Sequence, residues 1–181
     1  MRNEAIGTEN GNAIITPDSE VPAGSPGIWT ITYTAGSDGI REGGSERFEI
    51  PYGFTMPQFE FVNDPGYCRA ECSRQGVELE LSYDPPVPLP EKRFFYVTRW
   101  GRMVYVQIQG APLQEGDQLD FIYGERHNSA PGAWAQHFAA EVEFTVATDV
   151  DGTRSAKFSG YELVSEQPRI EVVADEPVET V

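Results

Sequence analysis

The chain has 181 residues, enough for one domain with its own hydrophobic core. Its 29 acidic and 13 basic residues give a formal net charge of −16. This charge disfavours nucleic acid and anionic membrane surfaces as partners, because both would be repelled. A hydrophobic fraction of 39% with 12% aromatic residues is typical of a globular chain and not of a disordered one.

The two ends differ in composition from the middle of the chain. Residues 1–22 are polar and have no apolar signal-peptide core, so they are predicted to be a flexible lead-in. No stretch is long and apolar enough for a transmembrane helix, so we expect a soluble protein without membrane insertion. The folded domain is predicted over residues 23–173, and the acidic residues 174–181 are predicted to be a tail or linker.

Alternation of apolar and polar residues dominates the middle of the chain. Trp29, Ile31 and Tyr33 alternate with threonines, which predicts a strand with Trp29 in the core. Other strands are predicted on the same grounds, strongly at 77–83, 104–109, 119–123 and 141–146, and more weakly at 47–50, 93–100, 155–161 and 168–173.

About nine short strands separated by turn residues predict an all-β fold, an immunoglobulin-like antiparallel β-sandwich. Prolines in the segments 51–57 and 84–90 fit edges and crossovers, because proline cannot donate to a sheet ladder. Residues 133–143 also fit about three helical turns, but the alternation that follows them favours a strand.

The two cysteines, Cys68 and Cys72, are separated by four positions. In an extended segment their Cα atoms would lie about 13 Å apart, too far for a disulfide. Two thiols without a matching histidine nearby do not define a zinc site, so we expect ordinary cysteines.

The segment 124–138 contains both histidines of the chain in a Ser/Pro/Gly-rich stretch between two predicted strands. We expect a surface loop, and its candidate binding residues are Arg126, His127, Trp134 and His137. Trp134 is predicted to be exposed and to anchor a partner, since aromatic residues dominate the energetics of interfaces.

Two segments carry residues that could bind a metal ion, and the sequence favours neither as a metal site. Glu125, His127, His137 and Glu141 carry suitable ligand atoms, but their spacing matches no standard ligand set. Residues 149–152, Asp-Val-Asp-Gly, resemble part of a calcium loop but lack its later ligands, so a type I′ hairpin turn is the simpler interpretation. No metal and no cofactor are therefore expected.

The sequence leaves two alternative functions open. A nucleophile elbow, a zinc-protease helix motif and a phosphate-binding loop are all absent, so no catalytic residue is assigned. A carbohydrate-binding module is an open alternative, because the three tryptophans and eight tyrosines could supply a platform for sugar rings. A small metal-dependent hydrolase using residues 124–141 is the second alternative, and it would need a bound ion at both histidines.

The pattern of turns and strands also resembles a known family. Residues 115–152 contain Gly116-Asp117 before a strand, Tyr123-Gly124 after it, and then Ala135-Gln136-x-Phe138. Residues 27–50 carry an aromatic-threonine strand followed by Gly-Ile and Gly-Gly-Ser. Together with PQFEF and LSYDP, these features resemble the N-terminal β-sandwich of bacterial domain-of-unknown-function proteins. Their larger C-terminal part is similar to PHP-type metal-dependent phosphoesterases.

The resemblance covers about residues 27–173 and implies a fold more strongly than a chemistry. PHP-type domains often open with a His-x-His motif, which this chain lacks, and the chain is too short to contain the catalytic part. The resemblance therefore implies a non-catalytic accessory domain that packs on or positions a metal-dependent hydrolase domain or subunit.

Overall fold

The computed structural model describes residues 9–84, 102–127, 130–152 and 161–174. These residues form 14 β-strands and no helix, which confirms the all-β prediction. The number of strands exceeds the predicted nine partly because β2, β3, β10 and β13 are two residues long. A strand of that length shows no periodicity in the sequence.

The first sheet has four antiparallel strands. In spatial order these are β1 (Asn12–Thr16), β4 (Trp29–Thr34), β9 (Gln118–Tyr123) and β6 (Cys68–Cys72). Strand β1 lies inside the predicted lead-in, but it pairs with β4 from Asn12 opposite Thr34 to Thr16 opposite Thr30. It buries Ala13 and Ile15 on its inner face. The ordered sheet therefore begins earlier than the predicted boundary at residue 23.

The second sheet has five strands, and all its neighbours are antiparallel. In spatial order these are β13 (Glu162–Leu163), β12 (Thr145–Asp149), β5 (Ser45–Glu49), β8 (Met103–Gln109) and β7 (Glu78–Ser82). The single strand predicted at 141–146 is divided at the buried Phe144, because the chain passes there from one sheet to another.

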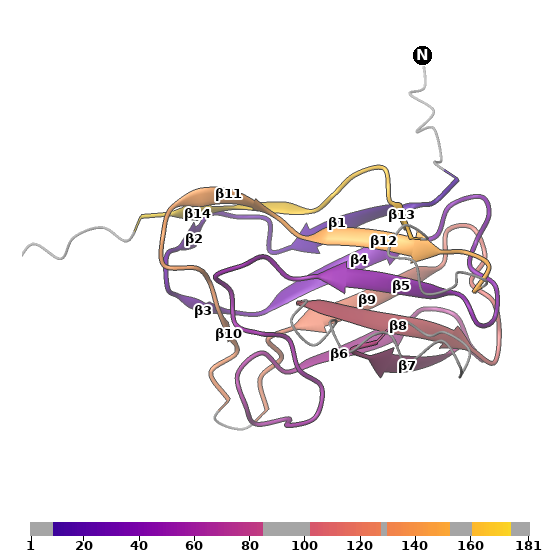
Figure 1. Ribbon diagram of the computed structural model, residues 1–181, viewed down its shortest axis with the longest axis horizontal. Helices are drawn as coiled ribbons and strands as arrows, with labels where there is room; N and C mark the ends of the chain where they lie inside the picture. The colour runs from indigo at the N-terminus through magenta and orange to yellow at the C-terminus, as the bar shows by residue number, and fades with distance from the viewer. Residues whose placement is uncertain (1–8, 85–101, 128–129, 153–160, 175–181) are drawn as a thin grey trace, which may run out of the picture.

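Two smaller sheets complete the described fold (Figure 1). Strands β11 (Ala140–Glu143), β14 (Arg169–Val173) and β2 (Val21–Pro22) form one, in which β14 and β2 are parallel. Strands β10 (Ala133–Trp134) and β3 (Pro26–Gly27) form the other. The helical alternative for residues 133–143 is wrong, since β10 and β11 occupy that range. The strand predicted at 93–100 and most of the one at 155–161 lie outside the described residues.

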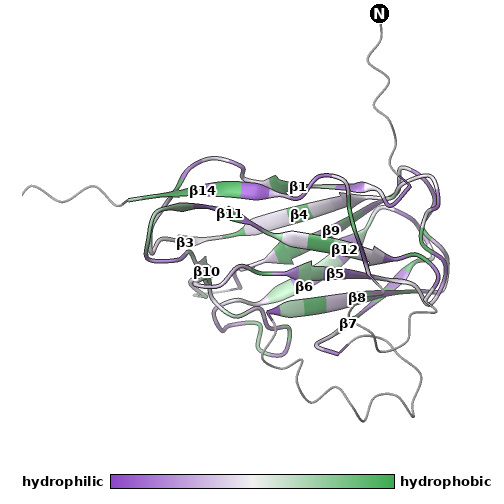
Figure 2. Ribbon diagram, turned by 45° about the horizontal axis from the view of Figure 1, so that its top comes forward, coloured by the Kyte–Doolittle hydropathy of each residue, from purple (hydrophilic) through white to green (hydrophobic). Residues whose placement is uncertain are grey.

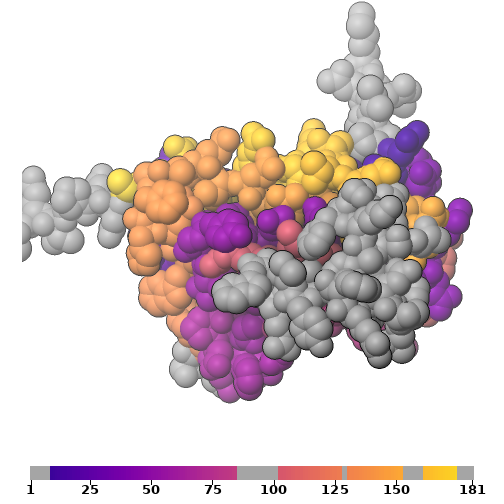
Figure 3. All heavy atoms as spheres, in the orientation of Figure 1, coloured from indigo at the N-terminus to yellow at the C-terminus, as the bar shows by residue number. Residues whose placement is uncertain are grey.

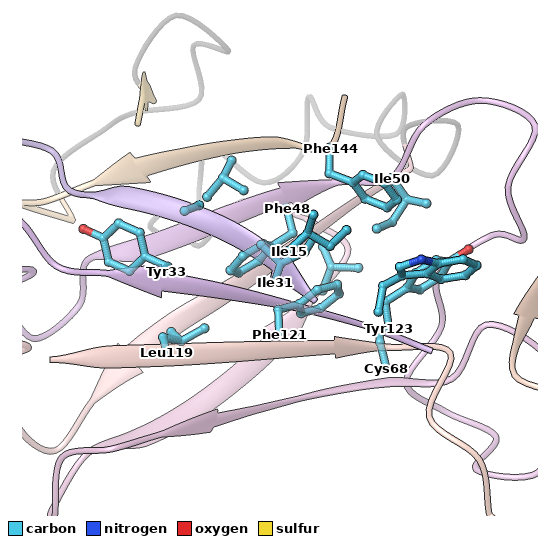
Figure 4. Close-up of a cluster of buried hydrophobic side chains, with 14 of the residues drawn as sticks. Ile15, Ile31, Tyr33, Phe48, Ile50, Cys68, Leu119, Phe121, Tyr123 and Phe144 are labelled. Carbon is cyan, nitrogen blue, oxygen red and sulfur yellow. The ribbon is translucent and has the colours of Figure 1, made fainter. Parts of the chain in front are cut away.

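The core lies between the four-stranded and five-stranded sheets. Phe48 from β5 and Phe121 from β9 are fully buried and stack with ring centroids 4.5 Å apart and an interplanar angle of 7°. Figure 4 shows these two rings among the inward-facing side chains of both sheets. The predicted core residue Trp29 is 1% exposed, which confirms its place there. Hydrophobic residues recur along the strands, and hydrophilic stretches lie at many of the turns (Figure 2).

Both cysteines lie on β6 and are free thiols, as the sequence predicts. Cys68 is fully buried, and its burial raises the pKa of the thiol well above the ordinary value. Because the thiolate is the reactive form, Cys68 should not react with Ellman's reagent at pH 8 until the protein unfolds. Cys72 is only partly buried and should react slowly in the folded protein. Rapid reaction of both thiols with Ellman's reagent in the absence of denaturant would contradict the burial of Cys68.

Candidate functional site

Two long loops meet at one end of the two larger sheets. One follows β5 and covers residues 50–66, and the other follows β9 and covers residues 124–139 (Figure 1). The N–H of Trp134 donates to Oγ1 of Thr55 at 2.7 Å, and the N–H of Thr55 donates to the carbonyl of Trp134 at 3.0 Å. The N–H of Gly66 donates to the carbonyl of Gly132 at 3.1 Å. These bonds join the two loops into one surface.

The loop at 50–66 is anchored in the core as well. Phe54 is 2% exposed, and its ring packs edge-on against Trp29 at a centroid distance of 5.5 Å. The hydroxyl of Tyr123 donates to the carbonyl of Thr55 at 2.5 Å. Arg102 donates to the carbonyl of Pro51 at 3.0 Å and also to that of Phe54. The loop is therefore held against the core by an aromatic cluster and by the guanidinium group of Arg102.

His127 belongs to a small polar cluster at the start of the second loop. Its Nε2 lies 3.0 Å from Oε2 of Glu125, and its ring meets that of Tyr67 edge-on at 5.5 Å. Arg69 donates from Nε to the other oxygen of Glu125 at 2.6 Å. Partial burial alone would raise the pKa of Glu125, but the hydrogen bonds from Arg69 and His127 outweigh it and lower that pKa. The Glu125 carboxylate therefore stabilises the position of the loop through its contacts with Arg69 and His127.

His137 has different neighbours. A methyl group placed on Gly24 would come within 2.7 Å of its Nδ1, so its ring lies directly over that glycine. Within the described part of the chain, no group of three or more His, Cys, Asp or Glu residues is placed to hold a metal ion. The structure thus does not bring His127 and His137 together with the carboxylates that a shared site would need.

The remaining candidates lie on the surface of the second loop. Trp134 is 41% exposed although its backbone is held on both sides, which confirms the expected exposure. Arg126 is exposed and lies over Gly132, where an added methyl group would be 3.1 Å from Nε. Glu141 is on β11, where its side chain is 3.5 Å from Arg169.

The residues that resembled part of a calcium loop follow β12. The N–H of Gly152 donates to Oδ1 of Asp149 at 3.1 Å, and Gly152 has a φ of +64°. Asp151 is paired with Arg41 at 2.8 Å. These contacts fit a turn. Strand β12 pairs with β13, and Thr148 lies opposite Glu162. Because these two residues are 14 positions apart, a two-residue hairpin at Asp151-Gly152 does not join the two strands.

The sequence did not predict one feature of this end of the molecule. Among the described residues, nine large hydrophobic side chains are exposed, and six of them lie on the two joined loops. We call these six the end patch: Tyr52, Met56, Phe61, Val62, Trp134 and Phe138. In Figure 3 the purple and magenta surface of the first loop adjoins the orange surface of the second. The prolines of the first loop predict an edge or a crossover and do not indicate this patch.

Comparison with known proteins adds no relative, since no protein-family model and no curated protein matches this chain. The resemblance to accessory domains of metal-dependent hydrolases therefore stays a prediction from the sequence. Among the residues described, no helix is long and apolar enough to span a membrane.

Proposed function

We propose that this protein is a non-catalytic interaction domain that docks on another protein through the end patch. In this proposal the four-stranded and five-stranded sheets form an immunoglobulin-like β-sandwich, and the two joined loops at its end carry the contact surface. The partner class comes from the sequence resemblance, which points to a metal-dependent hydrolase domain or subunit.

The observation that carries the proposal is the concentration of exposed apolar side chains on two loops that are themselves rigidly held. Phe61 and Phe138 are each 60% exposed, and Tyr52 is 75% exposed. Leaving such side chains in water is unfavourable, and patches of this kind mark contact sites on soluble proteins. A loop already fixed by hydrogen bonds loses little conformational freedom on binding, so its contacts contribute more fully to affinity.

The polar part of the candidate loop supports a contact role more than a chemical one. The Glu125 carboxylate is bonded to Arg69 and His127, and the ring of His137 lies over Gly24. Among the described residues, neither histidine belongs to a group of three or more potential metal ligands. Arg126 is exposed on the second loop and is available for polar contacts at the edge of an interface. Edge contacts of this kind direct association more than they set affinity.

The experiment is affinity capture from the source organism with three tagged proteins: the wild type, a Trp134→Ala/Phe138→Ala variant and an Ile14→Ala/Leu163→Ala variant. The control pair removes two apolar side chains that are each 57% exposed and lie outside the end patch. We expect the wild type and the control to capture the same metal-dependent hydrolase, identified by mass spectrometry. The end-patch variant should capture at least tenfold less, because truncating a tryptophan that is an interface hot spot costs about 2 kcal/mol or more.

Three outcomes would reject the proposal or change the partner. Equal capture by the end-patch variant and the wild type would remove the end patch from the interface. Capture of a protein without hydrolase activity would keep the surface but reject the partner class. Failure to capture any protein, together with binding to a glycan array that Trp134→Ala abolishes, would favour the carbohydrate-binding alternative.

A further inference from the structure

A groove of about 560 Å³ adjoins the end patch on the first loop. Met56 and Phe61, two members of the end patch, line it together with Tyr83 and Met103. The ring of Tyr83 is stacked on that of Phe59 with centroids 4.3 Å apart, which fixes one wall. The groove is therefore lined by thioether and aromatic groups, the adaptable and large surfaces that proteins use to receive an apolar side chain.

The rim of the groove is held in shape by one glutamine. Oε1 of Gln58 accepts hydrogen bonds from the N–H groups of Glu60 and Phe61, at 3.0 and 2.8 Å. Its Nε2 donates to the carbonyls of Phe61 and Asp64, at 2.8 and 3.3 Å. The backbone of the same residue is bonded to Gly66 and Cys68. The segment that carries Phe61 is thus fixed before any partner binds.

Two carboxylates, those of Glu60 and Asp64, also line this groove. Both residues are exposed, and neither forms an ion pair with a described residue. Their charges are part of the chain's formal net charge of −16. A second copy of the chain would bring like charge to the same place, which disfavours self-association.

We propose that this groove binds a basic segment of the partner protein, in which an apolar side chain is flanked by lysine or arginine. The apolar side chain lies against Met56 and Phe61, and the flanking cations meet Glu60 and Asp64. This inference rests on the proposed function and adds to it the chemistry of the partner's contact segment.

The test uses fluorescence anisotropy with a labelled peptide, Gly-Lys-Lys-Phe-Lys-Lys-Gly, and the full chain. Glu60→Gln/Asp64→Asn should weaken binding about three- to tenfold at low salt and reduce its dependence on salt. A control, Glu42→Gln/Glu115→Gln, removes the same two charges from exposed residues that precede β5 and β9, at the opposite end of these strands. The control should bind like the wild type, and a peptide with serine in place of phenylalanine should bind at least tenfold more weakly.

The outcomes separate this inference from the proposed function. Equal weakening by both charge variants would mean that the peptide responds only to net charge, which would overturn the inference. Loss of peptide binding in Phe61→Ala without any effect of Glu60→Gln/Asp64→Asn would keep an apolar site and overturn its preference for basic segments. Failure of the peptide to bind, combined with partner capture that depends on Trp134, would overturn the inference and leave the proposed function intact.

Discussion

Replacing Phe48 by alanine should lower the free energy of unfolding by about 3–5 kcal/mol, the range for removing a large buried aromatic side chain. Phe48 is fully buried on β5, and its stacked partner Phe121 is fully buried on β9. The pair therefore joins the five-stranded sheet to the four-stranded sheet. Urea unfolding followed by tryptophan fluorescence gives this free energy directly.

A double-mutant cycle with Phe121→Ala distinguishes this stacking from general loss of volume. The two changes should be non-additive by about 0.5–1.5 kcal/mol, as for aromatic pairs in contact. Phe61→Ala is the matched control, because it also removes a phenylalanine side chain, but one that is 60% exposed. It should change the free energy of unfolding by less than about 0.5 kcal/mol. Strict additivity, or a loss below about 1 kcal/mol for Phe48→Ala, would contradict the stacking of Phe48 on Phe121 in the core.

The second large effect concerns Glu46, a carboxylic acid inside the core. It is 0% exposed on β5, and neither of its oxygens accepts a hydrogen bond from a described residue. The groups that face it are Tyr33 of β4 and Thr148 and Asp149 of β12. Burial raises the pKa of Glu46 well above its ordinary value of 4.5. The nearby hydroxyls of Thr148 and Tyr33 oppose this rise only in part, and the neighbouring carboxyl of Asp149 adds to it.

This shift has a definite sign for stability. The unfolded chain releases the proton of Glu46 as the pH rises past its ordinary value, whereas the folded protein retains it. The unfolded state then binds fewer protons, so the free energy of unfolding falls as the pH rises, by at most about 1.4 kcal/mol per pH unit from this one group. The decline begins near the unfolded pKa and ends once the pH exceeds the raised folded pKa.

Glu46→Gln removes the ionisation and keeps the shape of the side chain. The stability difference between this variant and the wild type should grow in favour of the variant as the pH rises from 5 to 8, by up to about 1.4 kcal/mol per pH unit. Glu49→Gln, on the outer and half-exposed side of the same strand, controls for the loss of one negative charge. Chemical unfolding at each pH measures the difference. A difference for Glu46→Gln that does not change with pH would contradict the buried, proton-retaining state.

The strands that the sequence predicts most strongly are those in which alternation runs for five or more residues. Strands β4, β7, β8 and β9 repeat an apolar residue at every second position, and all four lie close to their predicted ranges. The sequence does not predict strand β1, because its buried positions, Ala13 and Ile15, are few and lie in a polar stretch. Pairing with β4 decides its structure, and such tertiary contacts leave little trace in the local sequence.

The end patch was less accessible to prediction than the strands. Exposure of Trp134 follows from its Gly/Pro-rich surroundings, and that prediction is confirmed. Residues 52–62 have no periodic pattern, so their apolar side chains could equally have belonged to the core. The hydrogen bonds that place this loop beside the second one join Thr55 to Trp134 and Gly66 to Gly132. Contacts between residues separated by 79 positions are a product of topology and not of spacing.

The most direct measurement of the central claim is site-specific photo-crosslinking in cells of the source organism. Benzoylphenylalanine is introduced in place of Phe61 in one protein and in place of Leu163 in another, since both side chains are well exposed but only Phe61 belongs to the end patch. If the end patch is the interface, irradiation should link the chain to a distinct protein from position 61 and not from position 163. Adducts of equal yield from both positions, or an adduct from position 163 alone, would contradict a docking role for the end patch.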